Sequence, residues 1–365
     1  HYYLHLPQIL GLTVVGALGA FLIAMSISGF MAHPRIFRDA FTFRRGDGRV
    51  PLTDLHNRLS VWTAPFHVSN ALTGAFLGLA TILAIAIASV SFSGDFFKVF
   101  SPVFGSAPPP IEGEADLAVI AGPIAFMLDT YPELSPTYFI LHDPMTAGQH
   151  STIIAEHSDR LIFGEYYNFD AAGTYQGSVG ISDGTIGQQI IGSVYNVHFG
   201  NWGGLPVKLA YLVFGLSLSI IIASGLRIYF TRRREKGRPA PRLEAGWEAI
   251  VWGTPAMLAV TLLAAVGLGV EGVGLVLIFW LGLTSLCAGA IIFARPDQVL
   301  RGLKAATGLL ISLALLIHLV QHMSLLASPA LYSITIALVL LVLSIGISLR
   351  LEVPKHAFKR KVPAE

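Results

Sequence analysis

The amino-acid sequence predicts an all-α polytopic membrane protein of about seven transmembrane helices that carries a small α+β domain. The chain has 365 residues, of which 53% are hydrophobic and 13% are charged, whereas about a quarter of the residues are charged in soluble domains. Long apolar runs alternate with short basic connections, and one long segment lacks this pattern. Most of the surface of such a chain has to be covered by lipid.

Seven apolar runs are long enough to cross a bilayer, because a transmembrane helix needs about 20 predominantly apolar residues. We expect each run to form one membrane-spanning helix. The runs lie near residues 7–32, 59–91, 205–230, 249–270, 273–294, 303–326 and 330–349.

Lysine and arginine predict the orientation of these helices. Basic residues gather in 35–49, 232–242, 295–304 and the tail, and all four segments fall on one face if the chain crosses the membrane at every run. The positive-inside rule makes this face cytoplasmic. We therefore expect a multi-pass protein with its longest connection on the opposite face, in the periplasm. The predicted domains are 1–92 with the first two helices, 93–204 as the periplasmic α+β domain, 205–350 with five helices, and 351–365 as a basic cytoplasmic tail.

The predicted periplasmic domain differs from the rest in composition. It is rich in glycine, proline and acidic residues, and Lys98 and Arg160 are its only strong bases. The stretch EADLAVIAGPIAFMLDTY predicts a helix, whereas TYFILHD, STIIAEH and RLIFGEYYNFD carry the alternation and β-forming residues of strands. The stretch DAAGTYQG is typical of a hairpin turn. These signals together predict a small α+β domain.

Several classes of chemistry are excluded. The single cysteine, Cys287, rules out a disulfide within the chain, a thiolate iron–sulfur cluster and covalent haem attachment. The stretch GLGVEG at 267–272 matches a dinucleotide motif but lies in a turn between two membrane runs, without the required strand and helix. The basic loops are typical of a cytoplasmic rim and not of a nucleic-acid site. Because the chain begins at His1 without a signal peptide, we expect residues to precede it.

Histidines at the ends of apolar runs are candidate ligands for haem b. His33 ends the first run and His56 lies before the second, both on the predicted cytoplasmic side. On the other side, His198 precedes the third run, and His1 or His5 precedes the first. Two imidazoles at matched depth on different helices can bind one haem iron from its two faces. The sequence thus predicts two haems, one near each face of the membrane.

The surroundings of these histidines support two interpretations. Small residues in the first two runs could leave space for a flat macrocycle, and Arg35, Arg38 and Arg58 could pair with haem propionates. Alternatively, the histidines anchor helices at the interface, and the glycines bring helices close together. The glycines concerned are Gly16, Gly19, Gly29, Gly74 and Gly78.

The other histidines are weaker candidates for a functional role. His67, His318 and His322 lie inside predicted spans, where an ionisable group is a functional candidate, although a neutral imidazole bonded to a carbonyl is an equal alternative. In the predicted periplasmic domain we expect solvated surface positions, with contact between one of these histidines and a substrate as the alternative, and in the basic tail we also expect a surface position. These surface histidines are His142, His150, His157 and His356.

Four stretches of the sequence resemble one known family. They are HYYLHLPQILG, SGFMAHPRIFRDAFTFR, LTDLHNRLSVWTAPFHVSNALTGAFLG and VHFGNWGGLPVKLAYLVFGLSLSIIIASGLRIYFTRRR. They are similar to the PepSY-associated transmembrane family, and within it to inner-membrane ferric-siderophore reductases of Gram-negative bacteria. The resemblance covers about the first 235 residues.

This resemblance implies haem b between transmembrane helices and electron delivery to a periplasmic iron chelate. It maps the histidine pattern of the family onto His1, His33, His56 and His198, and leaves the histidines inside the spans outside the pattern. Two departures stand out. Members usually begin with a further helix that carries a histidine and is followed by a PepSY-like region, and neither is seen before His1 in this sequence. The last spans have no assignable motif. The partner of His33 or His56 is therefore open.

The expected function is a ferric-siderophore oxidoreductase. A haem at His33 and His56 takes an electron from a quinol or a cytoplasmic reductase, and a haem at His198 with His1 or His5 passes it to a ferric siderophore docked on the domain around 100–200. Fe(II) is held less tightly than Fe(III) by hard oxygen ligands and dissociates. One alternative is an iron or siderophore permease whose path is lined by the histidines inside the spans. Another is an accessory module that binds a partner protein.

Overall fold

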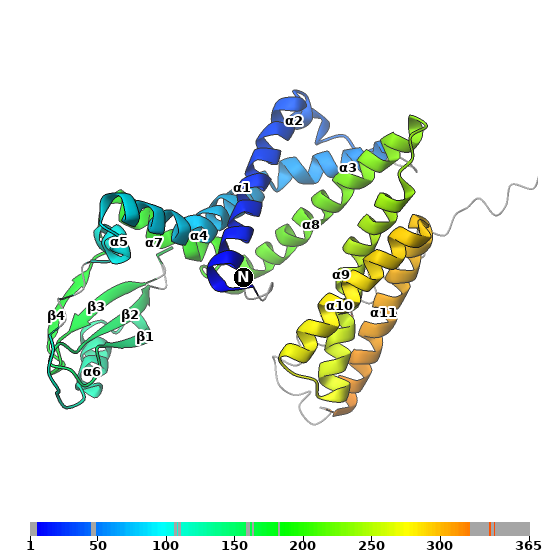
Figure 1. The fold of residues 1–365 in the computed structure, drawn as a ribbon. Coiled ribbons are helices and arrows are strands. Elements are labelled where there is room, and N and C mark those ends of the chain that lie inside the picture. The colour runs from blue at the N-terminus through cyan, green and yellow to red at the C-terminus, as the bar shows by residue number, and fades with distance from the viewer. Residues whose placement is uncertain are drawn as a thin grey trace, which may run out of the picture. The chain divides into compact units, whose positions relative to one another are not determined.

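A computed structural model describes residues 6–44, 49–105, 108, 111–157, 161–162, 164–181, 183–321, 336 and 339. The chain divides into two compact units (Figure 1). One contains His1–Arg44 and Asp54–Ile221, and the other contains Arg45–Thr53 and Ile222–Glu365. The division falls within the long helix α8, so each unit is described separately.

The described residues contain six helices that are long and apolar enough to cross a membrane. This confirms the predicted class of polytopic membrane protein with mostly helical structure. The predicted run at 330–349 lies outside the described residues, apart from Ile336 and Val339. The six helices are α1 (Gln8–Ala32), α4 (Ala64–Ser91), α8 (Gly204–Glu235), α9 (Pro241–Leu268), α10 (Val273–Phe293) and α11 (Pro296–Gln321).

The second predicted span is interrupted at its beginning. The sequence predicts one helix from about 59, whereas the structure has α3 (Arg49–Trp62), a break at Thr63, and then α4. The cause is Pro65, which lacks an N–H and lies in the first turn of α4, the position where a helix tolerates proline best. His56 and His67 therefore lie on two helices and not on one continuous helix. Before α3, the chain forms the short helix α2 (Ile36–Asp39).

Small residues bring α1 and α4 into backbone contact. A Cβ atom added at Gly78 would lie 2.5 Å from Cα of Gly16, and one added at Gly19 would lie 2.9 Å from the carbonyl oxygen of Ala71. Close packing of this kind is how helices associate in lipid, where no hydrophobic force draws them together. For Gly16, Gly19 and Gly78, the structure shows the helix-packing role that the sequence left as an alternative. Gly29 has no neighbouring atom within 4 Å of such a Cβ.

The first unit also contains the small α+β domain that the sequence predicts, with a four-stranded antiparallel sheet in the order β1-β2-β3-β4 (Figure 1). The β3–β4 hairpin turns at Asp170–Thr174, as expected from DAAGTYQG, and Gly173 there has a φ of 82°. We call the part from α5 to α7 the sheet domain. Its elements are α5 (Phe96–Phe104), α6 (Ala121–Thr130), β1 (Leu134–His142), β2 (His150–His157), β3 (Glu165–Phe169), β4 (Tyr175–Val179) and α7 (Ile186–Phe199).

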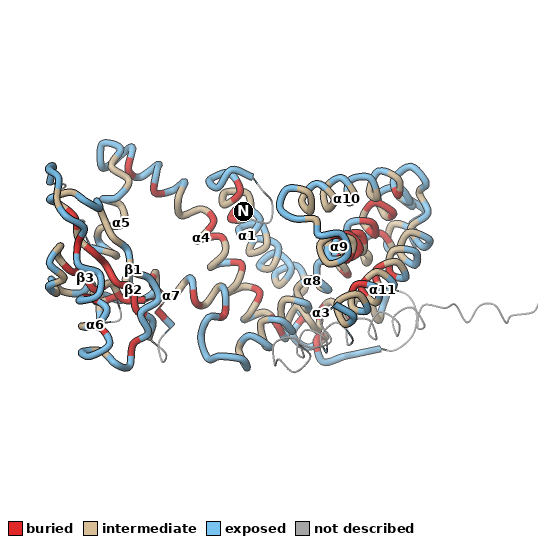
Figure 2. The backbone as a smooth tube through the Cα atoms, turned by 90° about the horizontal axis from the view of Figure 1, so that it is seen from below, coloured by how far each residue is buried: buried red, intermediate tan, exposed pale blue. Residues whose placement is uncertain are grey.

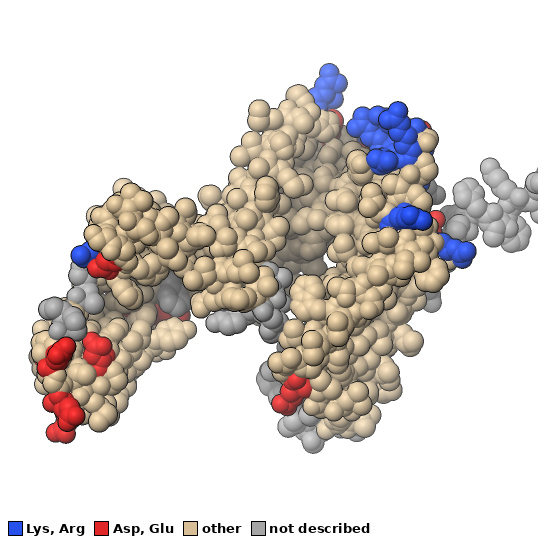
Figure 3. Space-filling view, in the orientation of Figure 1, with Lys and Arg blue, Asp and Glu red and all other residues tan. Residues whose placement is uncertain are grey.

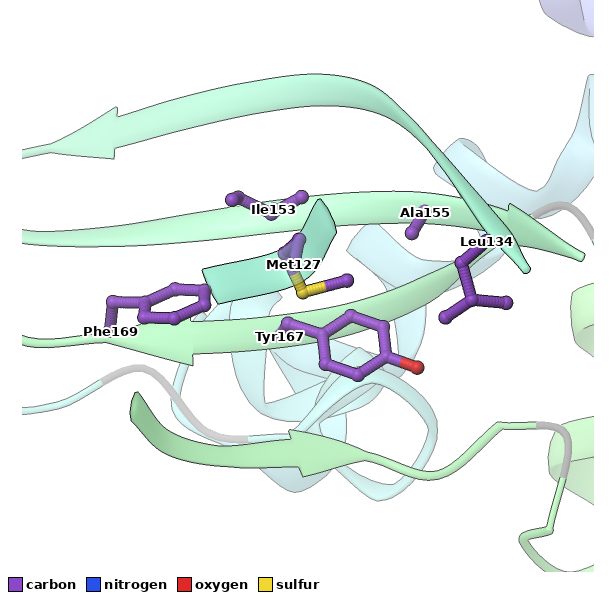
Figure 4. Packing of buried hydrophobic residues seen from close by; sticks show 6 residues of the cluster. All are labelled: Met127, Leu134, Ile153, Ala155, Tyr167 and Phe169. Carbon is purple, nitrogen blue, oxygen red and sulfur yellow. The ribbon is translucent and has the colours of Figure 1, made fainter. Parts of the chain in front are cut away.

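One face of the sheet packs against α6. Met127 of α6 is fully buried against inward-pointing side chains of β1, β2 and β3 (Figure 4). Because side chains alternate along a strand, the neighbouring positions His142, His150 and Tyr166 lie on the other face. There α5 approaches the sheet, and the ring of Phe104 lies 5.6 Å from that of Tyr166. The residues of the α6 cluster are Met127, Leu134, Ile153, Ala155, Tyr167 and Phe169.

In the second unit, α9 packs against both α10 and α11. The buried positions of α9 are mostly alanine and glycine, and Figure 2 shows red segments of the tube near α9. Glu248 of α9 is 4% exposed and accepts hydrogen bonds from Arg227 of α8, with Nε–Oε1 and Nη2–Oε2 distances of 2.8 and 2.6 Å. A buried carboxylate requires such a partner because an isolated charge is costly in an apolar setting.

The structure also buries Lys304, which the sequence placed in the basic rim. This lysine is 2% exposed on α11, and its Nζ lies 4.7 Å from the ring centroid of Trp252 on α9. Lys304 lies about two turns into α11, which begins at Pro296 and therefore before the start at 303 that the apolar run predicts. A large group of basic side chains lies where α8 ends and α9 begins (Figure 3).

We predict that Gly78→Val destabilises the first unit, because its Cβ would overlap the backbone of Gly16 and force α1 away from α4. The expected result is a lower midpoint of thermal unfolding of the detergent-purified protein, followed by tryptophan fluorescence. Gly29→Ala is the matched control, since space is open there, and it should leave the midpoint unchanged or raise it. Equal midpoints for Gly78→Val and the unmodified protein would contradict the packing described here.

Candidate histidine sites

His56 lies on α3 and is half-buried against α8. Its Nδ1 is 3.0 Å from the backbone carbonyl oxygen of Ile221. A carbonyl oxygen can only accept, so Nδ1 carries the proton and donates. In the neutral imidazole the lone pair is then on Nε2, and this nitrogen is the one able to bind a metal.

His198 lies in the last turn of α7 and packs on α4. Its Nδ1 is 3.1 Å from Oγ1 of Thr73, whose own hydroxyl donates to the carbonyl of Ser69 at 2.8 Å. The hydroxyl therefore accepts from the imidazole, and Nε2 again has the lone pair. Gly74 makes this contact possible, because a Cβ there would lie 2.8 Å from Cε1 of His198. The structure thus gives Gly74 a specific role, which is to leave room for a histidine ring.

His67 has the same arrangement within α4. It is 4% exposed, and its Nδ1 is 3.4 Å from Oγ1 of Thr63, which donates to the carbonyl of Leu59. Gly74 lies seven positions further along the helix, which is about two turns or 10 Å on the same face. His67 and the ring of His198 therefore lie on one side of α4. The sequence did not connect these two histidines.

Each of these three histidines has the tautomer that a metal-binding imidazole usually has. In proteins, a metal-binding imidazole usually donates its second nitrogen to an oxygen, which fixes the tautomer and the ring orientation. His56, His67 and His198 each do this with Nδ1 toward an oxygen of the chain.

His33 is held differently. It follows the last residue of α1, its side chain is 43% exposed, and its Nε2 lies 3.9 Å from Oδ2 of Asp39. His33 therefore has an acidic neighbour from α2, whereas His56 faces the carbonyl of Ile221. The predicted pairing of His33 with His56 stays a prediction.

The predicted propionate partners divide into two groups. Arg35 precedes α2 and Arg38 lies in it; both are exposed, and Nε of Arg38 lies 3.4 Å from Oδ1 of Asp39. Arg58 instead donates to the carbonyls of Ala40 and Phe41, and its guanidinium lies 5.0 Å from the ring centroid of Trp62. Arg58 thereby connects α3 to the segment that follows α2.

Of the remaining candidate histidines, the structure describes His318. His318 lies in the last turn of the described part of α11. His1, His5 and His322 lie outside the described residues. The predicted pairing of His198 with His1 or His5 therefore stays a prediction.

Sequence reasoning missed a second site, in the sheet domain. His142 and His150 are not on open surface: they face each other as a cross-strand pair of β1 and β2, with ring centroids 4.5 Å apart and an angle of 11° between the rings. Burial, together with the neighbouring His150, lowers the pKa of His142. The available signal was HDPMTAGQH, in which two histidines flank the turn between adjacent strands. Both line a cavity of about 800 Å³.

Comparison with known proteins agrees with the membrane-spanning part of this description. A curated protein of Pseudomonas aeruginosa, described as uncharacterized, is 32% identical over 104 residues, which are 28% of this chain and 26% of that protein. The matched region thus spans about a quarter of the length of that relative. The sequence profile of the PepSY-associated TM region matches residues 1–232, which include α1, α4, the sheet domain and most of α8. The chain therefore belongs to the PepSY-associated transmembrane family.

Proposed function

We propose that this chain is a haem b reductase of the bacterial inner membrane that passes electrons to a ferric siderophore in the periplasm. The observation that carries the proposal is the shared state of His56, His67 and His198. Each directs an Nδ1–H toward an oxygen of the protein and has its lone pair on Nε2. Imidazoles held in one tautomer on the helices of a membrane protein are candidates for function.

In this proposal, His56 and His198 hold two haems, one toward each face of the membrane. His33 is the proposed second ligand at the basic face, and His1 or His5 at the opposite face. Arg35 and Arg38 are exposed beside α2 and are suited to propionate groups. When bound, haem b would supply a one-electron change at its iron. The carbonyl of Ile221 and the hydroxyl of Thr73 keep the rings oriented and increase the basicity of Nε2.

The charge distribution is consistent with electron transfer toward the sheet domain. Basic residues gather where α8 ends and α9 begins, which indicates the cytoplasmic face. The sheet domain follows the C-terminal end of α4, and Figure 3 shows acidic side chains on it. A quinol or a cytoplasmic reductase would supply the electron, and the ferric chelate would receive it. Fe(II) would then dissociate, because hard oxygen ligands hold it less tightly than Fe(III).

A permease that moves iron or a siderophore is the alternative from another class. It would use His67, His318 and His322 as the lining of a path. In this structure His67 is almost fully buried beside Thr63, which suits a fixed ligand better than a path-lining group. An accessory module that binds a partner protein would require neither haem nor transport.

We predict that the detergent-purified full chain is coloured and shows reduced b-type absorption bands. The expected content is two haems per chain, measured by a pyridine haemochrome assay. The dithionite-reduced protein should reduce a ferric siderophore, and an Fe(II)-specific chelator should detect the Fe(II) that is released. A colourless protein that supports uptake of labelled iron in vesicles would instead establish the permease.

The proposed ligands give a second prediction. His33→Ala and His198→Ala should each remove one of the two haem signals, because each variant would delete one of the nitrogens proposed to hold a haem. His150→Ala is the control, since this histidine lies in the sheet domain and not on a membrane helix, and it should retain both. If His33→Ala and His198→Ala keep full haem content and activity, the ligand assignments are wrong.

A third prediction concerns the position of His198. Gly74→Ala should cause the same haem loss as His198→Ala, because the added Cβ would occupy the space of the imidazole. Gly215→Ala is a matched control on α8, where no neighbouring atom lies within 4 Å of the added Cβ. The haem content of both variants is measured from absorption spectra normalised to protein concentration. Unchanged haem content in Gly74→Ala would mean that His198 does not act from this position.

A further inference from the structure

The cavity of the sheet domain has the size of a small-molecule site. It measures about 800 Å³, within the range of about 300–1,000 Å³ that is usual for ligand pockets. It lies on the face of the sheet opposite α6, where the end of α5 and all four strands contribute. Apolar side chains such as Phe104, Ile140 and Val179 line it together with a few polar groups. A cavity with this lining is suited to a ligand with an apolar body and polar edges.

Hydrogen bonds fix the polar groups of this cavity. Nε2 of His142 lies 3.3 Å from Oγ1 of Thr152, which donates to Oδ1 of Asn168 at 2.9 Å. Thr152 therefore accepts from His142, whose Nδ1 is left with the lone pair. Nδ1 of His150 donates to the carbonyl of Gly148 at 3.1 Å, so its lone pair is on Nε2. The cavity thus presents two imidazole acceptors of defined tautomer.

The ring geometry argues against a metal site. The two rings are nearly parallel, at 11°, and the lone pair of an imidazole lies in the plane of its ring. Lone pairs in two parallel planes do not converge on one ion. The described residues also contain no cluster of three or more metal-binding side chains. Hydrogen bonding and stacking are therefore the interactions that His142 and His150 can offer.

The charge of the cavity limits the ligands further. Among the described residues that line it there is no lysine or arginine. Its one carboxylate is Asp170, which accepts from the backbone N–H of Thr174 and from Nε2 of Gln176, both at 2.8 Å. The lowered pKa of His142 favours the neutral ring at pH 7. A ligand with several negative charges would find no cation here and would be repelled by the acidic domain.

We propose that this cavity binds iron(III) chelates of the uncharged or cationic, hydroxamate type and rejects chelates of the polyanionic, catecholate type. The inference rests on the proposed function and adds its substrate class. Three hydroxamates carry three negative charges in total and neutralise Fe(III), whereas three catecholates leave a charge of three minus. The amide N–H groups at the edge of the ligand would donate to His142 and His150, and its methylene chains would pack on the apolar wall.

The test uses gallium(III) complexes, which have the charge and size of the iron complexes and are not reduced. Binding to the full detergent-solubilised chain is measured by titration calorimetry, first with a gallium trishydroxamate and then with a gallium triscatecholate. We expect saturable binding of the first and none of the second. Equal or tighter binding of the triscatecholate would overturn the proposal.

Variants locate the site. His150→Leu should weaken binding of the trishydroxamate about tenfold, since it removes one of the proposed hydrogen bonds, worth up to about 1.5 kcal/mol. Gln176→Ala should also weaken binding, because it removes a lining side chain and leaves the carboxylate of Asp170 without one of its donors. Gln176 is exposed at the edge of the cavity, so its variant does not endanger folding. Thr137→Val is the control on β1, because the hydroxyl of Thr137 donates to the carbonyl of Ser135 and Thr137 is not among the described residues that line the cavity.

The outcome is separable from the test of haem chemistry, because gallium binding requires no electron. If Gln176→Ala and His150→Leu bind the trishydroxamate as tightly as the unmodified chain, the cavity is not the site, even where the protein contains haem and reduces iron. If the chain lacks haem but binds the gallium trishydroxamate through these residues, the reductase proposal fails and the binding site stands.

Discussion

The pairing of imidazole N–H groups with oxygens of the chain is the constraint on which the candidate site depends. Water is scarce within a membrane protein, so a buried N–H has to find its acceptor in the protein itself. Ile221 provides a carbonyl oxygen for His56, and Thr63 and Thr73 provide hydroxyl oxygens for His67 and His198. Each threonine is available as an acceptor because its own proton is donated to a carbonyl one turn earlier. One helical hydrogen bond thereby determines the tautomer of a histidine beside it.

Helix α4 brings these constraints together, since its different faces meet different partners. Gly78 contacts the backbone of α1, while Gly74 and Thr73 receive the ring of His198 from α7. A larger residue at either glycine would change one of these contacts. At the beginning of the helix, Pro65 and the break at Thr63 separate α3 from α4, so that His56 faces α8 rather than following the line of His67.

Much of this fold was predictable from the sequence, because hydropathy and charge act locally. Apolar length predicted the six described spans, and β-forming stretches predicted the sheet with its β3–β4 turn. The break at Thr63 was missed because a proline in a first turn does not interrupt an apolar run. The burial of Lys304 was missed because it depends on Trp252 from another helix. The pairing of His142 with His150 required the register of β1 against β2, which the sequence pattern does not determine.

Close packing bears on the choice between electron transfer and transport. A permease has to open a path alternately to each side, so the helices that line it need two arrangements of similar stability. In the first unit, Gly16 and Gly78 bring two backbones into direct contact, and a shift of either helix would break many small contacts at once. Electron transfer between fixed centres needs no such motion, and it gains from ligands that are held in one orientation. The tight contact of α1 with α4, beside histidines whose ring positions are already determined, therefore favours a rigid electron carrier over a moving transporter.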